Sequence, residues 1–173
     1  VRFAAQLGFD IAPETFEAIE RNRERIRIVS RERIITEINK IVLSPVPSIG
    51  FELMDMTGLL PLVFPEMSRL KGVEKVGLHG HKDNFTHTLK VLDNVALNSD
   101  SLWLRWAAIL HDIGKPATKA YDPAAGWTFH GHEVVGARMV PDIFRRMKLP
   151  LNDRMKYVRK LVLLHLRPQI LSD

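Results

Sequence analysis

The sequence predicts an all-α protein, and three observations support this prediction. Apolar residues recur at intervals of three and four along most of the 173-residue chain, which is the spacing of one helix face. Residues that start or stop helices, such as Ser30 and Gly8, flank these segments. No stretch of useful length alternates between apolar and polar residues, as a half-buried strand would.

The first predicted domain covers residues 1–70 and begins with short helices. One spans residues 1–7 and stops at Gly8, and the next runs from about 13 to 22 with Pro13 in its first turn. After a short linker, Ser30 is expected to cap a helix whose apolar face carries Ile34, Ile35, Ile38, Ile41 and Val42.

The rest of this domain is expected to be broken by prolines. That helix should end before Pro45, and Ser48 is expected to cap another helix, which Gly58 ends. Residues 59–70 are apolar but contain two prolines, so we expect turns and short helical pieces there.

The second predicted domain covers residues 71–173 and reads as a helical bundle. Several glycines mark a loop between residues 72 and 80, and a longer loop is expected at 114–131. Four helices are expected, at residues 85–97, 102–113, 133–147 and 153–166.

Composition limits the class of protein. Hydrophobic residues make up 46% and charged residues 26%, as in ordinary globular proteins. The absence of cysteine excludes disulfides and thiolate sites, and no apolar run approaches the roughly 20 residues that span a bilayer. We therefore expect a cytoplasmic protein that does not enter membranes. Because it begins at Val1 rather than Met, we expect a piece of a longer protein.

Positive charge is concentrated in two stripes. The net charge is +5, with six Arg against two Glu in residues 21–33 and seven Lys or Arg against one Asp in residues 145–160. Clustered cations favour contact with a phosphate backbone, although solvated helix faces explain them equally well. The candidate RNA-binding residues are Arg21, Arg23, Arg25, Arg31, Arg33, Lys156 and Arg159.

Histidines and one aspartate form a candidate metal site. His87 lies in one predicted helix, and the next delivers His111 and Asp112 at its end, with Lys115 shortly after. Imidazole and carboxylate suit Mg, Mn, Fe, Co or Ni. A metal there could activate water against a phosphorus centre while Lys115 offsets negative charge, so Asp112 and Lys115 are candidate catalytic residues.

Two further histidines, His132 and His165, could extend this site toward a second metal or could be structural, and both interpretations stay open. Aromatic residues at 103, 106, 127 and 129 could stack on bases. The first two lie within an apolar helical stretch and are expected in the core, and none is assigned to a site.

The motifs together resemble those of the bacterial tRNA nucleotidyltransferase/poly(A) polymerase family. HTL at 87–89, HDIGKP at 111–116 and FHGHE at 129–133 are similar to its HD domain. RFAAQLGF at 2–9, SRERI at 30–34, TGLL at 57–60 and FPE at 64–66 are similar to the segments preceding that domain. These matches cover nearly the whole chain in the family's order.

The resemblance implies a helical, RNA-binding neck at 1–70 and a C-terminally truncated HD metal-phosphohydrolase domain at 71–173. The parent would extend tRNA 3′ ends, or tail RNA with A, using Mg²⁺ with ATP or CTP in a head domain absent here. The motif that selects the nucleotide would lie just before Val1. HD proteins usually add an Asp ligand in the helix after His165, a position for which the chain offers only its terminal Asp173.

The expected activity is metal-dependent hydrolysis of 2′,3′-cyclic phosphates or nucleotides, together with binding of tRNA or other RNA. The alternatives are a stand-alone HD nucleotide phosphohydrolase, against which the basic neck and the missing Met argue, and a non-catalytic RNA-binding scaffold. An apolar patch exposed near Val1 could also pair two copies as a homodimer.

Overall fold

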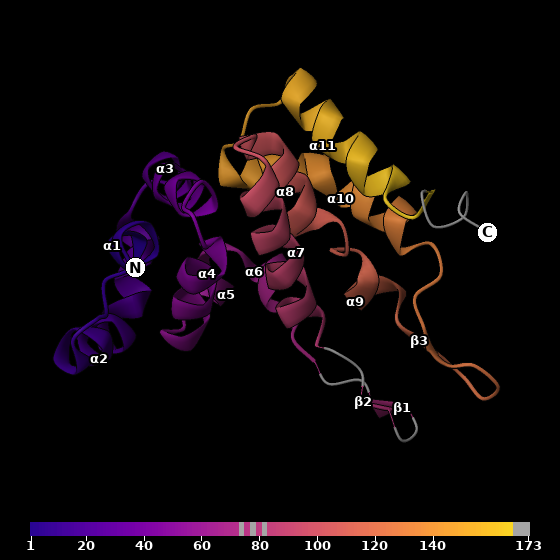
Figure 1. The fold of residues 1–173 in the computed structure, drawn as a ribbon, viewed down its shortest axis with the longest axis horizontal. Helices are drawn as coiled ribbons and strands as arrows, with labels where there is room; N and C mark the ends of the chain where they lie inside the picture. Colours follow the sequence, from indigo (N-terminus) through magenta and orange to yellow (C-terminus); the bar gives the residue numbers. More distant parts are fainter. Residues whose placement is uncertain (73–74, 77–78, 81–82, 168–173) are drawn as a thin grey trace.

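The computed structural model describes residues 1–72, 75–76, 79–80 and 83–167, and it confirms the all-α class (Figure 1). Within the described residues, the only strands belong to two short hairpins. No helix in this part of the chain combines the length and the apolar character needed to cross a bilayer.

The N-terminal elements follow the predicted order. They are α1 (Arg2–Leu7), α2 (Pro13–Asn22), the 3-10 helix η1 (Arg23–Ile28), α3 (Arg31–Val42), α4 (Pro47–Met56), α5 (Leu60–Val63) and α6 (Pro65–Ser68). Gly8 ends α1 in the left-handed conformation, at φ 68°, and the Ser30 side chain caps α3 by accepting from the Arg33 N–H. The predicted linker after α2 is wrong, because η1 occupies it.

The predicted cap at Ser48 is also wrong. Pro47 is the first residue of α4, because proline fits the first turn of a helix, where a backbone N–H would have no acceptor within the helix. The Ser48 backbone N–H instead donates to Asp93 Oδ1 on α7, at 3.0 Å. A side chain distant in sequence therefore accepts a hydrogen bond from a backbone N–H in the first turn of α4.

The C-terminal elements are β1 (Lys75–Val76), β2 (His79–Gly80), α7 (Asn84–Asn98), α8 (Leu102–Leu110), α9 (Lys115–Thr118), β3 (Ala120–Asp122), β4 (Gly126–Thr128), α10 (His132–Met147) and α11 (Asp153–Leu164). Two expectations are corrected. The helix predicted to reach residue 113 ends at Leu110, and the predicted loop 114–131 contains α9 and the β3–β4 hairpin, whose strands are too short to show alternation.

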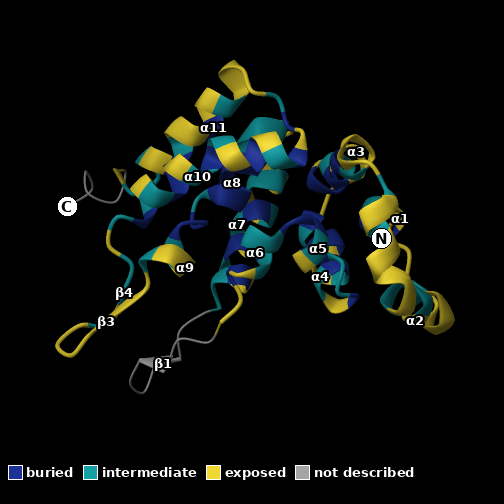
Figure 2. Cartoon of the chain, turned by 180° about the vertical axis from the view of Figure 1, so that it is seen from behind, coloured by how far each residue is buried: buried dark blue, intermediate teal, exposed yellow. Residues whose placement is uncertain are grey.

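One hydrophobic core runs through both predicted domains, and the buried residues gather where the helices meet (Figure 2). Trp106 of α8 is fully buried at its centre, with its ring centroid 5.9 Å from that of Phe64 and 6.4 Å from that of Phe144. Its indole N–H donates to Asn39 Oδ1 on α3 at 2.8 Å. Trp106 thus joins the N-terminal helices to the bundle, as expected of a core residue.

Candidate metal centre

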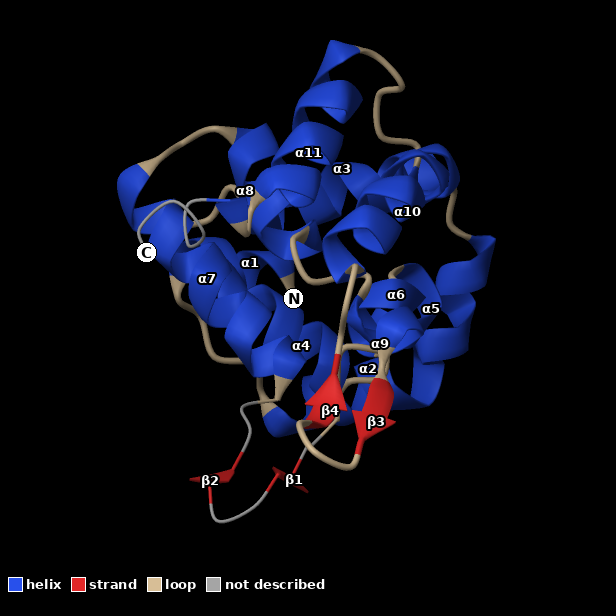
Figure 3. Ribbon diagram, turned by 90° about the vertical axis from the view of Figure 1, so that its right-hand side faces the viewer, coloured by secondary structure: helices blue, strands red, loops and turns tan. Residues whose placement is uncertain are grey.

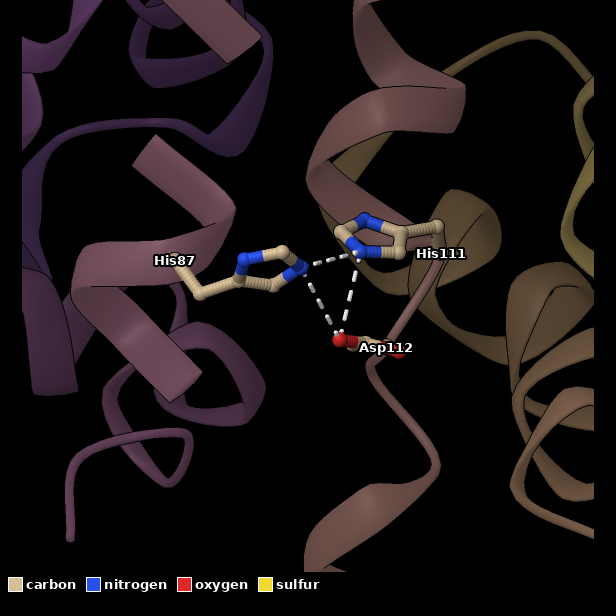
Figure 4. Close-up of side chains that lie close together, drawn as sticks. All are labelled: His87, His111 and Asp112. Carbon is tan, nitrogen blue, oxygen red and sulfur yellow. Dashed lines mark hydrogen bonds and ion pairs between the residues drawn. The ribbon is translucent and has the colours of Figure 1, made fainter. Parts of the chain in front are cut away.

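Four helices bring one histidine each to a common point. His87 comes from the end of the first turn of α7, which Asp83 caps, and His111 directly follows α8. His132 opens α10 and His165 follows α11. Figure 4 shows His87 and His111 facing Asp112 from two different elements.

Asp112 lies at the middle of this cluster, with only 3% of its side chain exposed. Its Oδ2 lies 3.2 Å from His111 Nε2, 3.7 Å from His87 Nε2 and 2.7 Å from Lys115 Nζ. Its Oδ1 lies 3.2 Å from His132 Nε2 and 3.7 Å from His165 Nε2. The two carboxylate oxygens therefore face two different histidine pairs.

Backbone carbonyls orient three of the rings. The Nδ1 atoms of His111, His132 and His165 lie 2.7, 2.9 and 2.7 Å from the carbonyl oxygens of Ala108, Phe129 and Val162. Because a carbonyl oxygen only accepts, each Nδ1 donates to it, and this contact turns each Nε2 toward Asp112. Orientation of a histidine through its second nitrogen is typical of metal ligands.

The distances between the facing nitrogens fit metal coordination. His87 and His111 place their Nε2 atoms 3.4 Å apart, and His132 and His165 place theirs 3.3 Å apart. Two nitrogens at about 2.1 Å from one tetrahedral ion are about 3.4 Å apart. His87, His111 and Asp112 could hold one ion, and Asp112, His132 and His165 could hold another.

The charges of the cluster favour a cation at its centre. Burial alone would raise the pKa of Asp112, but hydrogen bonds from His111, His132 and His165 outweigh it and hold that pKa well below its usual range. Burial lowers the pKa of His165, but its hydrogen bonds to Asp112 and to the Val162 carbonyl raise it overall. In the metal-free chain, a proton on His165 therefore partly balances the carboxylate.

Gly114, part of the HDIGKP motif, was not among the predicted site residues, but its backbone packs beside the cluster. A Cβ there would collide with the His132 carbonyl oxygen and lie 2.7 Å from the Gly136 nitrogen. The chain after Asp112 therefore packs directly on the backbone of the first turn of α10. The only sequence signal is the glycine itself, since the contact depends on two segments meeting.

The cluster lies in a cavity of about 910 Å³, within the range of small-molecule sites. Lys115 and Arg167 add positive charge to its lining. The opposite side is apolar and comes from α7, α8 and α11, through residues that include Val91, Val95, Leu104, Leu161 and Leu164. The possible ligand Asp173 lies outside the described residues.

The candidate RNA-binding side chains are all exposed: Arg21, Arg23, Arg25, Arg31, Arg33, Lys156 and Arg159. Within the two basic stripes, α2 lies apart from α11 in Figures 1 and 2, but the start of α3 meets the end of α10, so residues 21–33 and 145–160 are in contact there. The neck stripe does contact the bundle, where Arg31 Nη1 donates to the Arg146 carbonyl at 3.2 Å.

Comparison with known families gives the class of the chain. The HD domain family matches residues 84–172, which include every member of the cluster, and the family described as "Probable RNA and SrmB- binding site of polymerase A" matches residues 8–71. The chain therefore belongs to the HD domain family.

Its similar proteins are tRNA nucleotidyltransferases, which confirms the resemblance. The A-adding tRNA nucleotidyltransferase of Deinococcus radiodurans is 36% identical over 157 residues, covering 86% of this chain and 36% of that protein. The CC-adding tRNA nucleotidyltransferase of Thermus thermophilus is 35% identical, covering 80% of this chain and 34% of the relative. The multifunctional CCA protein of Pseudomonas fluorescens Pf-5 is 35% identical, with coverage of 86% and 37%. The chain thus spans about a third of the length of these relatives.

Proposed function

We propose that this chain is the neck and HD domain of a tRNA nucleotidyltransferase or poly(A) polymerase, and that the HD domain hydrolyses phosphate esters of nucleotides, including 2′,3′-cyclic phosphates. The observation that carries the proposal is the convergence of four imidazole Nε2 atoms on the buried carboxylate of Asp112. The family matches at 8–71 and 84–172 support a division near residue 70, into a neck at 1–70 and an HD domain at 71–173.

Divalent ions such as Mg, Mn, Fe, Co or Ni, one held by His87, His111 and Asp112 and one by Asp112, His132 and His165, would supply Lewis acidity toward a phosphate oxygen. Asp112 would be shared by the two groups, because one of its oxygens faces His87 and His111 and the other faces His132 and His165. Lys115, whose ammonium lies 2.7 Å from Asp112 Oδ2, offsets negative charge that develops on the phosphate oxygens.

RNA binding is the second part of the proposed function. The neck arginines on α2, η1 and α3 contact RNA phosphates, and Lys156 and Arg159 on α11 form a second contact surface. In the whole protein, a head domain would use Mg²⁺ with ATP or CTP to extend the RNA. The names of the relatives, which add A, CC or CCA to tRNA, support tRNA as the partner.

The metal content of purified variants tests the site. After identical loading with Mn²⁺ or Ni²⁺ and removal of free ion, mass spectrometry should find about two ions per chain in the wild type and about one in His87→Ala and His165→Ala. Asp112→Ala should hold none, because it removes a ligand from both groups. His130→Ala is the matched control, since His130 is exposed and outside both groups.

Hydrolysis of 2′,3′-cyclic AMP should fall with metal content across the same variants. Wild-type metal content in Asp112→Ala would refute the assignment of the site. Metal binding without hydrolysis of any nucleotide ester would refute the phosphohydrolase and leave the non-catalytic RNA-binding scaffold.

Self-association through the N-terminal end is also part of the proposal. Phe3, Leu7 and Phe9 are 58%, 58% and 61% exposed there. Such an apolar patch supports a homodimer, which sedimentation of Leu7→Glu against the wild type would test. An unchanged molecular mass in the variant would refute pairing through this surface.

A further inference from the structure

The β3–β4 hairpin is attached at both ends to the candidate metal centre. The segment before it begins at Lys115, whose ammonium contacts Asp112 at 2.7 Å. The segment after it reaches Phe129, whose carbonyl accepts from His132 Nδ1 at 2.9 Å. The hairpin extends away from the helices at the lower right of Figure 1, and Figure 3 shows its two strands side by side. The hairpin is therefore joined to the centre through residues on both sides of it.

Two large aromatic side chains lie on this hairpin outside the core. Tyr121 and Trp127 are cross-strand partners, with ring centroids 5.2 Å apart and an interplanar angle of 70°. They are 64% and 37% exposed, whereas Trp106 is fully buried. Pairing stabilises the hairpin, but it does not account for so much aromatic surface left in water.

Positive charge accompanies these rings along the path to the centre. The Lys119 ammonium lies 4.4 Å from the Trp127 ring centroid, and the Lys115 ammonium lies 5.8 Å from that of Phe129. The one carboxylate of the hairpin, Asp122, accepts from the backbone N–H groups of Ala124 and Ala125 in the turn. Aromatic faces next to cations are what proteins use to bind unpaired bases joined by phosphates.

We propose that the β3–β4 hairpin is a stacking platform for single-stranded RNA, with an unpaired base on Tyr121 and Trp127 and the adjoining phosphates alongside Lys119 and Lys115. The inference rests on the proposed function in one respect, that the strand leads a phosphate toward the metal centre. The inference also names the substrate class of the metal centre, which is an RNA strand or RNA end with unpaired bases. Duplex RNA is excluded because its bases are already stacked on one another.

Intrinsic tryptophan fluorescence tests the platform directly. Single-stranded hexaadenylate should quench the emission of the 173-residue chain, and Trp127→Ala should remove the part of the quenching that comes from this indole. The dissociation constant should rise about 5- to 150-fold, the range for loss of one base–aromatic stack. Tyr121→Ala should also weaken binding, whereas an RNA duplex of the same length should leave the Trp127 emission unchanged.

Two variants separate stacking from loss of hairpin structure. Trp127→Phe keeps an aromatic face, so it should bind hexaadenylate within about 3-fold of the wild type although the indole signal is lost. Leu97→Ala, which removes an apolar side chain that is 79% exposed on α7, should bind as the wild type does. Wild-type affinity in both Trp127→Ala and Tyr121→Ala, or equal quenching by duplex RNA, would overturn the inference.

The same titration in Asp112→Ala distinguishes this inference from the proposed function. Selective quenching should persist there, because stacking needs no metal. If the wild type hydrolyses no phosphate ester but single-stranded RNA still quenches Trp127, the proposed function fails and the platform stands. If the wild type hydrolyses phosphate esters but the hairpin variants bind hexaadenylate normally, the platform fails and the proposed function stands.

Discussion

Replacing Arg105 with Met should destabilise the whole chain. Arg105 lies within α8 and is 2% exposed. Its Nη1 donates to the carbonyls of Val42 and Ser44, at 2.8 and 2.9 Å, and its Nε and Nη2 donate to those of Ser99 and Ala96, at 3.0 and 3.2 Å. These acceptors lie at or just beyond the ends of α3 and α7, where carbonyls have no partner within the helix.

The magnitude follows from the two hydrogen bonds that are fully buried, those to Val42 and Ser44. A hydrogen bond to a charged group contributes about 1.5–3 kcal/mol, so losing both costs about 3–6 kcal/mol. Methionine fills most of the space and avoids the cost of burying the guanidinium, which returns part of that sum. We expect a net loss of about 2–4 kcal/mol in the free energy of unfolding, a large share of the stability of a small protein.

Urea unfolding followed by circular dichroism measures this loss as a lower midpoint. Asp100→Asn is the control, because Asp100 Oδ1 lies 3.5 Å from the same guanidinium but its side chain is wholly exposed. It should unfold at the wild-type midpoint, since exposed ion pairs contribute little. A wild-type midpoint in Arg105→Met, with an unchanged slope, would refute the argument that these carbonyls need a donor.

Three further outcomes are expected. Gly114→Ala forces a Cβ onto the His132 backbone, so it should lower the free energy of unfolding by about 1–3 kcal/mol and reduce metal content. Thermal melts and mass spectrometry measure these two effects. A wild-type melting temperature would contradict the close packing at Gly114. In the metal-free chain, stabilisation by His165, whose pKa is raised on folding, is complete below about pH 6.5 and is lost as pH rises through the folded value. Stabilisation by Asp112, whose pKa is lowered, is complete above about pH 4 and is lost as pH falls toward the lowered value. In EDTA, the melting temperature should therefore decline more steeply above pH 6.5 in the wild type than in His165→Gln. Equal declines would contradict stabilisation by the protonated His165. Binding of tRNA should weaken steeply as the salt concentration rises, and Arg25→Glu should reduce the slope of log Kd against log salt concentration by about one or more. An unchanged slope would show that Arg25 does not contact the RNA.

Most of the helices could be predicted because their signals are local. The Ser30 cap, the Gly8 stop and the spacing of apolar residues each act within one or two turns, so they can be read without knowing the fold. The errors occurred where a distant group forms the deciding contact, or where an element is too short to show a pattern. Asp93 satisfies the start of α4 in place of a local cap, and strands as short as β3 and β4 show no period to recognise.

The sequence by itself determined the family, the all-α class and the core of the candidate site, His87 with His111 and Asp112, because motif order and spacing carry that information. Only the tertiary structure places the Nε2 atoms of His132 and His165 at 3.2 and 3.7 Å from the second oxygen of Asp112. It alone brought the start of α3 to the end of α10, where the two basic stripes meet, and joined the hairpin segment to the centre through Lys115 and Phe129. The reason is physical: these features depend on how helices from different parts of the chain pack around Trp106 and Arg105, and sequence spacing contains no record of that packing.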